Sequence, residues 1–376
     1  MPRLDPSPYD ALLLVSFGGP ETPADVRPFL ENVTRSRGIP PERLSEVAEH
    51  YAAFGGRSPI NEQCRMLRDA IRADLAAQGI DLPIYWGNRN WHPYLTDTLR
   101  QMTVDGVRRA ACFVTSAYAS YSGCRQYREN LFDAVASVGP GAPRLDRLRH
   151  YFNHPGFVTP FVDATLAALA KLPDEMRKTA RLVFVTHSIP LAMNDASGRS
   201  DGTEGGAYEA QHRDVASVVA AAVADASGIA RDHDLVYCSR SGAPSMPWLE
   251  PDIGDHLRAL RADGVDAAVV VPIGFVSDHM EVVFDLDTEA AEIADDIGLA
   301  MVRAATPGVH PRFVAMVREL LIERATAARA EEHPRATVGG LPPSWNVCPA
   351  GCCRNAREPD HPALCGVDAP DMTSTS

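Results

Sequence analysis

The stretch "RLVFVTHSIP", residues 181–190, shows how this chain is built. Its apolar and β-branched residues predict a buried strand that runs directly into His187 and Ser188. Pro190 cannot donate a backbone hydrogen bond, so it ends the strand pairing and leaves His187 at the rim of a sheet. Ligands bind beyond the carboxyl ends of strands in open α/β sheets. His187 is therefore a candidate functional residue, with a structural role as the alternative.

Short apolar runs alternate with longer amphipathic stretches along most of the chain. The candidate strands are residues 11–17, 83–88, 110–117, 181–188, 235–239, 267–275 and 299–305. The candidate helices are 24–33, 60–78, 94–105, 125–137, 156–171, 207–226, 252–262, 279–296 and 311–331. This alternation predicts parallel sheets buried on both faces, with three strands before residue 150 and four after it. We expect two similar Rossmann-like α/β domains, residues 1–153 and 154–330, followed by a linker and a cysteine-rich tail, residues 331–376.

Composition excludes several classes of partner. The chain has 376 residues, 45% of them hydrophobic, which is enough for two domain cores. A formal net charge of −13 argues against binding to nucleic acid or to an anionic membrane. No apolar run approaches the roughly 18 residues of a spanning helix, so stable membrane insertion is not expected. We expect a cytoplasmic monomer.

A file of acidic residues lies in "FVSDHMEVVFDLDTEAAE", residues 275–292. Glu281, Asp285 and Glu289 are four residues apart, and a helix would place them on one face. No Lys or Arg occurs within the stretch. Such a file can be an ordinary solvated face. If it faces His187, the imidazole and carboxylates instead form a group suited to moving protons or holding a divalent cation.

Several ordered motifs resemble the ferrochelatase family over roughly residues 10–325. They are "FGGPET" (17–22), "YAAFGGRSPI" (51–60), "VTHSIP" (185–190), "PWLEPD" (247–252) and "VPIGFVSDHMEVVFDLD" (271–287). The resemblance implies two Rossmann-like domains with a porphyrin cleft between them. It also implies an enzyme that inserts Fe²⁺, its substrate, into a porphyrin during heme biosynthesis.

The resemblance assigns roles to four residues. His187 matches the family's active-site histidine and Glu281 its acidic partner, both expected to act on the pyrrole protons and on Fe²⁺. Which of the two is the base and which the metal ligand stays open. Asp285 and Glu289 match further acids on an iron or proton path. Family members often wind this helix locally as a π-helix, which would align the acids still better.

Further residues resemble the porphyrin-binding rim of the family. They are Phe17 in an apolar wall, Ser58 and Tyr127 as donors to propionates, and His50 with Arg35 and Arg37 nearby. Ser58 and Tyr127 have alternative interpretations as an ordinary loop serine and a core tyrosine. A composition rich in Ala, Arg and Asp and an unanchored chain favour coproporphyrin III as the substrate. Protoporphyrin IX is the alternative.

The tail concentrates cysteines at positions 348, 352, 353 and 365, which in a cytoplasmic chain indicates a metal site. Some ferrochelatases carry a [2Fe–2S] cluster bound by three terminal cysteines and one internal cysteine. That pattern implies Cys124, Cys348, Cys353 and Cys365 here, with Cys352 as the alternative to Cys353. A structural Zn²⁺ site is the rival interpretation.

Two other functions remain open from the sequence. One is a non-catalytic protein that binds a tetrapyrrole or a metal on the same fold. The other is a chelatase for cobalt or nickel. A binding protein has no need of a proton acceptor, so the presence of both His187 and Glu281 favours the enzyme. Transient contact with neighbouring enzymes of heme synthesis is also expected.

Overall fold

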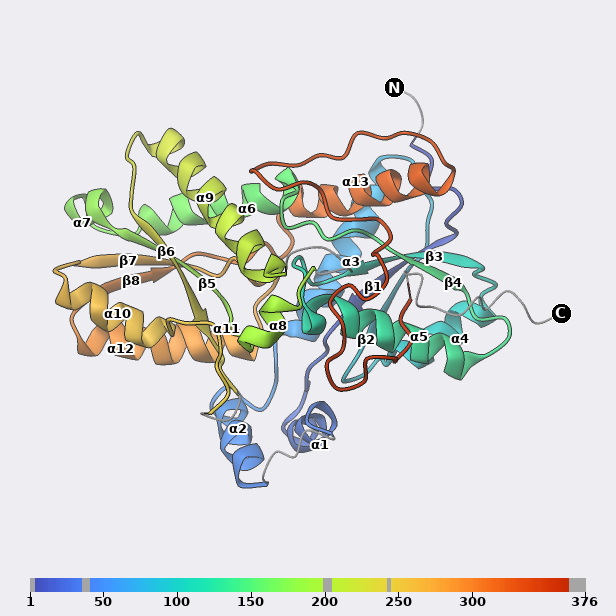
Figure 1. Cartoon of the computed structure of the whole chain (residues 1–376), viewed down its shortest axis with the longest axis horizontal. Coiled ribbons are helices and arrows are strands. Elements are labelled where there is room, and N and C mark those ends of the chain that lie inside the picture. Colours follow the sequence, from blue (N-terminus) through green and yellow to red (C-terminus); the bar gives the residue numbers. More distant parts are fainter. Residues whose placement is uncertain (1–3, 36–40, 199–204, 242–244, 365–376) are drawn as a thin grey trace.

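Two parallel four-stranded sheets form the molecule, as Figure 1 shows. The computed structural model describes residues 4–35, 41–198, 205–241 and 245–364. In the first sheet the strands lie in the order β2 (Ile84–Asn88), β1 (Ala11–Ser16), β3 (Arg109–Val114) and β4 (Arg144–Arg147). In the second the order is β6 (His233–Cys238), β5 (Arg181–His187), β7 (Ala267–Val271) and β8 (Ala300–Arg303). The expected fold of two similar α/β halves is confirmed.

Helices cover both faces of each sheet. In the first half these are α1 (Pro23–Val33), α2 (Pro41–Ala53), α3 (Ile60–Ala77), α4 (Leu95–Val104) and α5 (Gln126–Val138). In the second half they are α6 (Pro155–Leu169), α7 (Asp174–Thr179), α8 (Leu191–Asp195), α9 (Ala207–Ser227), α10 (Ile253–Ala262) and α13 (Pro311–Ala328). The helices α1 and α2 project below the junction of the two sheets (Figure 1).

The central strands are apolar because helices bury them from both sides. Every residue of β1 and of β7 is buried, and β5 is buried from Leu182 to Thr186. His187, the last residue of β5, is only half-buried. The two sheets repeat one order, with the first strand of each half between the second and the third. As a result, the carboxyl ends of β5 and β7 lie side by side.

The strand β4 was not predicted from the sequence. Its residues "RLDR" contain one apolar side chain, so they carry none of the β-branched pattern that marks the other strands. Burial is possible because the charges are paired. Asp146 accepts hydrogen bonds from Arg109 Nε at 2.6 Å and from Arg324 Nη2 at 3.1 Å. A buried strand built from ion pairs looks like a solvent-exposed loop at the level of sequence.

The acidic helix has three parts. It begins as α11 (Met280–Phe284), winds as a π-helix, η2 (Asp285–Glu289), and ends as α12 (Ala290–Asp296). The π-helical winding implied by the family resemblance is therefore present. A second π-helix, η1 (Tyr121–Arg125), contains Cys124.

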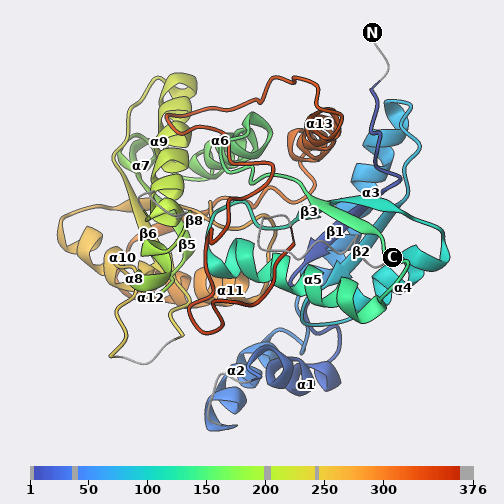
Figure 2. The same ribbon diagram turned by 45° about the vertical axis from the view of Figure 1, so that its right-hand side comes forward.

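The end of the chain returns to the first half. Helix α13 packs against both α6 and α3. Arg149 Nε donates to Glu323 of α13 at 2.7 Å, and its Nη2 donates to the carbonyl of Ala336 at 2.9 Å. Residues 331–364 then run as an irregular segment, red in Figure 2, beside α5 and the start of α9. The described tail is therefore fixed on the body of the protein.

A glycine lies where the loop after β7 crosses the end of β5. A Cβ atom on Gly274 would lie 2.8 Å from the backbone Cα of Thr186 and closer still to its hydroxyl. Since Thr186 precedes His187, this contact sets how closely the acidic helix approaches the histidine.

We predict that Gly274→Ala lowers the free energy of unfolding by about 1–3 kcal/mol, because the added methyl group must displace the end of β5. Chemical denaturation monitored by circular dichroism measures this change. Gly340→Ala is the matched control, since the nearest atom to its Cβ lies at 3.6 Å. Equal stability of the two variants would show that the close approach at Gly274 is unimportant.

Candidate functional site

His187 and Glu281 come together at the carboxyl ends of the second sheet. His187 Nε2 lies 3.5 Å from Glu281 Oε1, and the Nδ1 atom contacts the carbonyl of Ser188. Glu281 lies in the first turn of α11, which follows the loop after β7. The Glu281 side chain is 47% exposed, so a bound molecule could reach this carboxylate.

Each member of the pair shifts the pKa of the other. Burial alone would lower the pKa of His187, but the Glu281 carboxylate raises it to about 9. Partial loss of hydration would raise the pKa of Glu281, but the His187 imidazolium lowers it to about 2. At neutral pH the pair is therefore an imidazolium beside a carboxylate.

His279 is a third member of this group that the sequence analysis did not single out. It caps α11, and its Nδ1 accepts a hydrogen bond from the backbone N–H of Glu281 at 3.3 Å. Burial and the nearby His187 lower the pKa of His279, so it accepts this bond as a neutral imidazole. Its position two residues before Glu281, at the helix start, was the available signal.

The other two acids continue along the same helix. Asp285 accepts a hydrogen bond from Ser239 Oγ, and burial together with Glu281 and Glu289 raises its pKa to about 7. Burial also raises the pKa of Glu289. A pocket beyond them is lined by Asp285 and Glu289 together with Asp252, Glu292 and Asp296. The acid file thus continues from the His187–Glu281 pair into an acidic pocket.

A buried hydrogen-bond network fixes the backbone carbonyl of His187 and the hydroxyl of Thr186. Tyr208 Oη donates to the His187 carbonyl at 2.8 Å and also lies 2.8 Å from Thr186 Oγ1. His212 Nε2 lies 2.9 Å from the same Thr186 hydroxyl, and its ring stacks on Tyr118 of the first half. The network therefore connects the end of β5 to both halves of the molecule.

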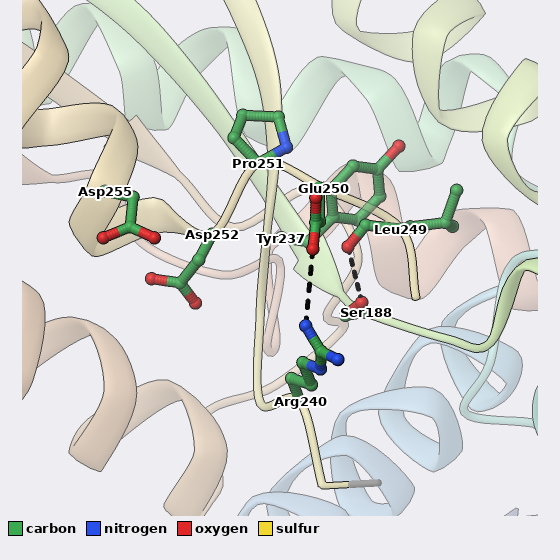
Figure 3. Close-up of a pocket in the computed structure, with 8 residues that line it drawn as sticks. All are labelled: Ser188, Tyr237, Arg240, Leu249, Glu250, Pro251, Asp252 and Asp255. Carbon is green, nitrogen blue, oxygen red and sulfur yellow. Dashed lines mark hydrogen bonds and ion pairs between the residues drawn. The ribbon is translucent and has the colours of Figure 1, made fainter. Parts of the chain in front are cut away.

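Ser188, which directly follows His187 at the end of β5, lines a separate pocket (Figure 3). Its hydroxyl donates to the carbonyl of Leu249 at 2.8 Å, and Arg240 of the same pocket pairs with Glu250 at 3.3 Å. The Ser188 bond fixes the loop after β6 against the end of β5. This pocket is distinct from the His187–Glu281 pair.

Among the first-half residues expected at the porphyrin rim, His50 lies against the acidic helix. Its ring stacks on Phe284 with centroids 3.8 Å apart. Phe17 is half-buried and makes an edge contact with Phe29. Arg35 is exposed, and Arg37 lies outside the described residues.

The two predicted propionate donors are both buried. Ser58 is 7% exposed, and its Oγ accepts a hydrogen bond from the backbone of Ile60. Tyr127 is 5% exposed and lies beneath the guanidinium of Arg89, which is 4.6 Å from the ring centroid. Arg89, which the sequence analysis did not single out, also lies over Phe17.

Four buried cysteines meet where the tail crosses the first half. Cys124 of η1 forms one cluster with Cys348, Cys352 and Cys353, and we call this the thiol cluster. Hydrogen bonds from Cys348 and Cys353 lower the pKa of Cys124 well below its ordinary value. The Sγ atoms of Cys352 and Cys353 are 3.8 Å apart. The expected meeting of Cys124 with the tail is present, and Cys365 lies outside the described residues.

Comparison with known proteins identifies the family. The family model named Ferrochelatase matches residues 9–325. The chain belongs to the ferrochelatase family. The expectation of a ferrochelatase enzyme is therefore confirmed, and the His187–Glu281 pair lies inside the matched region.

Relatives match this ferrochelatase along nearly all of its length. The chain is 61% identical over 370 residues to the coproporphyrin III ferrochelatase of Streptomyces griseus, covering 97% of this chain and 98% of that protein. It is 59% identical to the coproporphyrin III ferrochelatase of Streptomyces coelicolor, covering 98% of each. It is 50% identical to the ferrochelatase of Rhodopirellula baltica, covering 92% of this chain and 93% of that protein. In the described part of the chain, no helix has the length and apolar character needed to cross a membrane.

We predict that Glu281→Gln lowers the pKa of His187 from about 9 to a value at or below that of an ordinary histidine, because the paired carboxylate is its largest source of stabilisation. Nuclear magnetic resonance titration of the imidazole measures this pKa. Asp285→Asn, which removes a more distant charge, should give a smaller fall in the same direction. A His187 pKa still near 9 in the Glu281→Gln protein would contradict the pairing.

Proposed function

We propose that this ferrochelatase inserts Fe²⁺ into coproporphyrin III to form iron coproporphyrin III (coproheme) in heme biosynthesis. The observation that carries the proposal is the ion pair of His187 with Glu281 at the start of an acidic π-helix. The named substrate of the two Streptomyces relatives supports the choice of porphyrin. Protoporphyrin IX is the second candidate, because the Rhodopirellula relative is named ferrochelatase without a stated substrate.

The pair suits the proton balance of the reaction. Metallation brings one Fe²⁺ into the ring and removes two pyrrole protons. His187 holds a proton in the resting pair and cannot accept another. A divalent cation near the Glu281 and Asp285 carboxylates repels the imidazolium and lowers its pKa. The imidazolium then releases its proton to water, and the resulting imidazole can accept one pyrrole proton as the metal enters. A carboxylate of the acid file accepts the second pyrrole proton and passes it to water.

The acidic π-helix provides a path for the cation. Asp285 and Glu289 line both the helix and the acidic pocket beyond it, so an iron ion can pass between carboxylates toward Glu281. Asp285 is ionised only above pH of about 7, since burial raises its pKa to that value. Iron delivery should therefore depend on pH through Asp285.

We place the porphyrin against the residues of the first half that face the acidic helix. The stacking of His50 on Phe284 supports this placement, because it brings α2 to the start of the π-helix. Phe17 then contributes an apolar contact, and Ser58 and Tyr127 donate to propionates. Because Ser58 and Tyr127 are buried in the described structure, their hydroxyls must become accessible when the porphyrin binds.

The substrate assignment predicts a preference between two porphyrins. In anaerobic assays with Fe²⁺ that follow the shift of the Soret band, kcat/KM should be higher for coproporphyrin III than for protoporphyrin IX. A buried, charge-assisted bond to each additional propionate is worth about 1.5–3 kcal/mol, so the preference should be at least about tenfold. A preference for protoporphyrin IX would refute the coproporphyrin assignment, while metallation of neither porphyrin would refute the proposed activity.

The pKa of Asp285 predicts how iron use depends on pH. Between about pH 8 and about pH 6 the apparent KM for Fe²⁺ should rise several-fold, because the carboxylate becomes protonated as the pH falls through its pKa of about 7. In Asp285→Asn the KM should be raised throughout and this pH dependence should be lost.

Asp287→Asn is the matched control, since Asp287 lies on the same π-helix but pairs with Arg303 Nη2 at 2.8 Å. It should keep the pH dependence of the parent protein. If the Asp285→Asn protein shows the parental pH dependence, the titrating group lies elsewhere.

We also propose that the thiol cluster holds a [2Fe–2S] cluster through Cys124, Cys348, Cys353 and Cys365, with Cys352 as the alternative to Cys353. The donor set fits: all four thiols of the thiol cluster are buried, and Gly198 N–H donates to Cys353 Sγ at 3.2 Å. Within the described residues no three His, Cys, Asp or Glu side chains are arranged around a single metal ion. A two-iron cluster divides its ligands between two irons, so it does not require that arrangement. When bound, the cluster would supply a structural or redox-sensing centre.

The cysteine assignments can be tested by colour. Cys124→Ser, Cys348→Ser and Cys365→Ser should each abolish the visible absorption of a [2Fe–2S] cluster, because each removes a ligand. Of Cys352→Ser and Cys353→Ser, only one should do so. Cys64→Ser, which changes a buried cysteine bonded to Ser16 outside the thiol cluster, is the control and should keep full colour. A colourless parent protein that contains one zinc ion per chain would overturn the iron–sulfur assignment.

The broader setting is part of the same proposal. We propose that residues 1–153 and 154–330 form the two domains and residues 331–376 the tail, which accords with one sheet in each half. We further propose a cytoplasmic monomer that makes transient contacts with neighbouring enzymes of heme synthesis.

A further inference from the structure

Two buried arginines lie beside the thiol cluster. Arg147, the last residue of β4, donates from Nη2 to Cys348 Sγ at 3.3 Å. Arg128 of α5 donates from Nη2 to the carbonyl of Cys352 at 3.5 Å. Both side chains are almost completely removed from solvent, since Arg147 is 2% exposed and Arg128 is 0% exposed. The thiols therefore lie next to two positive charges that water does not screen.

Buried guanidinium groups require negative charge nearby, because burial of an isolated ion is very costly. Elsewhere in the chain carboxylates fill this role: Arg125 pairs with Glu129 at 3.0 Å and Arg149 with Glu323 at 2.7 Å. Near Arg128 and Arg147 lie sulfur atoms of the thiol cluster: Arg147 donates a hydrogen bond to Cys348 Sγ, and the nearby cysteines favour the charged form of Arg128. The arginines are thus placed to balance thiolates, and an iron–sulfur cluster bound there carries thiolates permanently.

We propose that Arg147, assisted by Arg128, raises the reduction potential of the [2Fe–2S] cluster in this protein. The inference rests on the proposed cluster and adds the residues that set its redox behaviour. A one-electron reduction adds a negative charge to a group that is already anionic. Nearby cations and an N–H donor to a ligand sulfur stabilise the reduced form more than the oxidised form. Arg147 supplies both effects, and Arg128 supplies charge.

Arg147 lies in a paired strand of the first sheet. Its strand, β4, is the polar strand that the sequence analysis missed, and it pairs with β3 so that Arg147 lies opposite Cys112. The backbone of Arg147 is therefore held in the sheet, on a different segment of the chain from Cys348, to which its side chain donates.

The test is a redox titration of the protein with its cluster, monitored by electron paramagnetic resonance. Arg147→Met should assemble the cluster but shift its midpoint potential downward. The ratio of reduced to oxidised cluster at a fixed potential should fall by on the order of tenfold, which corresponds to about 59 mV for a one-electron couple. Arg147→Lys keeps the charge and loses the rigid fork, so its potential should fall by less. Arg181→Met is the control, because Arg181 pairs with Asp234 at the start of β5 and should leave the potential unchanged.

The outcomes separate this inference from the cluster proposal. A parent protein without iron and acid-labile sulfide would overturn both. If the parent protein holds the cluster and neither Arg147→Met nor Arg147→Lys changes the midpoint potential, only the proposed role of Arg147 is overturned. If Arg147→Met does not fold, Arg147→Lys decides the question, with folding checked by circular dichroism. An equal downward shift in Arg181→Met would also overturn the assignment, because it would show that any lost cation has the same effect.

Discussion

The ion pair between His187 and Glu281 is the interaction on which the rest of the site depends. It joins the end of β5 to the start of α11 and fixes the charge of both groups, an imidazolium and a carboxylate at neutral pH. Neighbouring residues fix the positions of His187 and Glu281. Gly274 lets the loop after β7 cross Thr186 closely, Tyr208 holds the carbonyl of His187, and His279 caps the helix that carries Glu281. The acids beyond Glu281 then have a fixed direction relative to the histidine.

Much of the fold was predictable because its strands are apolar. Strands β1, β5 and β7 are buried on both faces, and their sequences carry that burial directly as runs of Leu, Val and Ala. Strand β4 was not predictable, since its burial depends on partners that are distant in sequence, such as Arg324 for Asp146. The file of Glu281, Asp285 and Glu289 was visible from its spacing, but its meeting with His187 was not, because that depends on the order of strands in the sheet.

Three residues of the sites that the sequence did not indicate are His279, Arg128 and Arg147. His279 acts through a backbone hydrogen bond at a helix start, a role that its residue type does not announce. Arg128 and Arg147 lie in segments whose sequences gave no metal signal, although both contact the thiol cluster. The cysteines were conspicuous because thiols crowd into the tail, but the charges that surround them come from α5 and β4. Sequence patterns reveal the reactive groups of a site more easily than they reveal the neighbouring groups that control the charge of the site.

The most direct test of the account is a single-turnover metallation with His187→Ala. The variant and the parent protein are each mixed anaerobically with coproporphyrin III and Fe²⁺, porphyrin binding is measured by fluorescence quenching, and iron insertion is followed by the shift of the Soret band. Loss of the proton acceptor should reduce insertion by at least about 100-fold while porphyrin binding stays close to that of the parent. Insertion at the parental rate in a protein that lacks His187 would contradict the claim that this ion pair performs the chemistry.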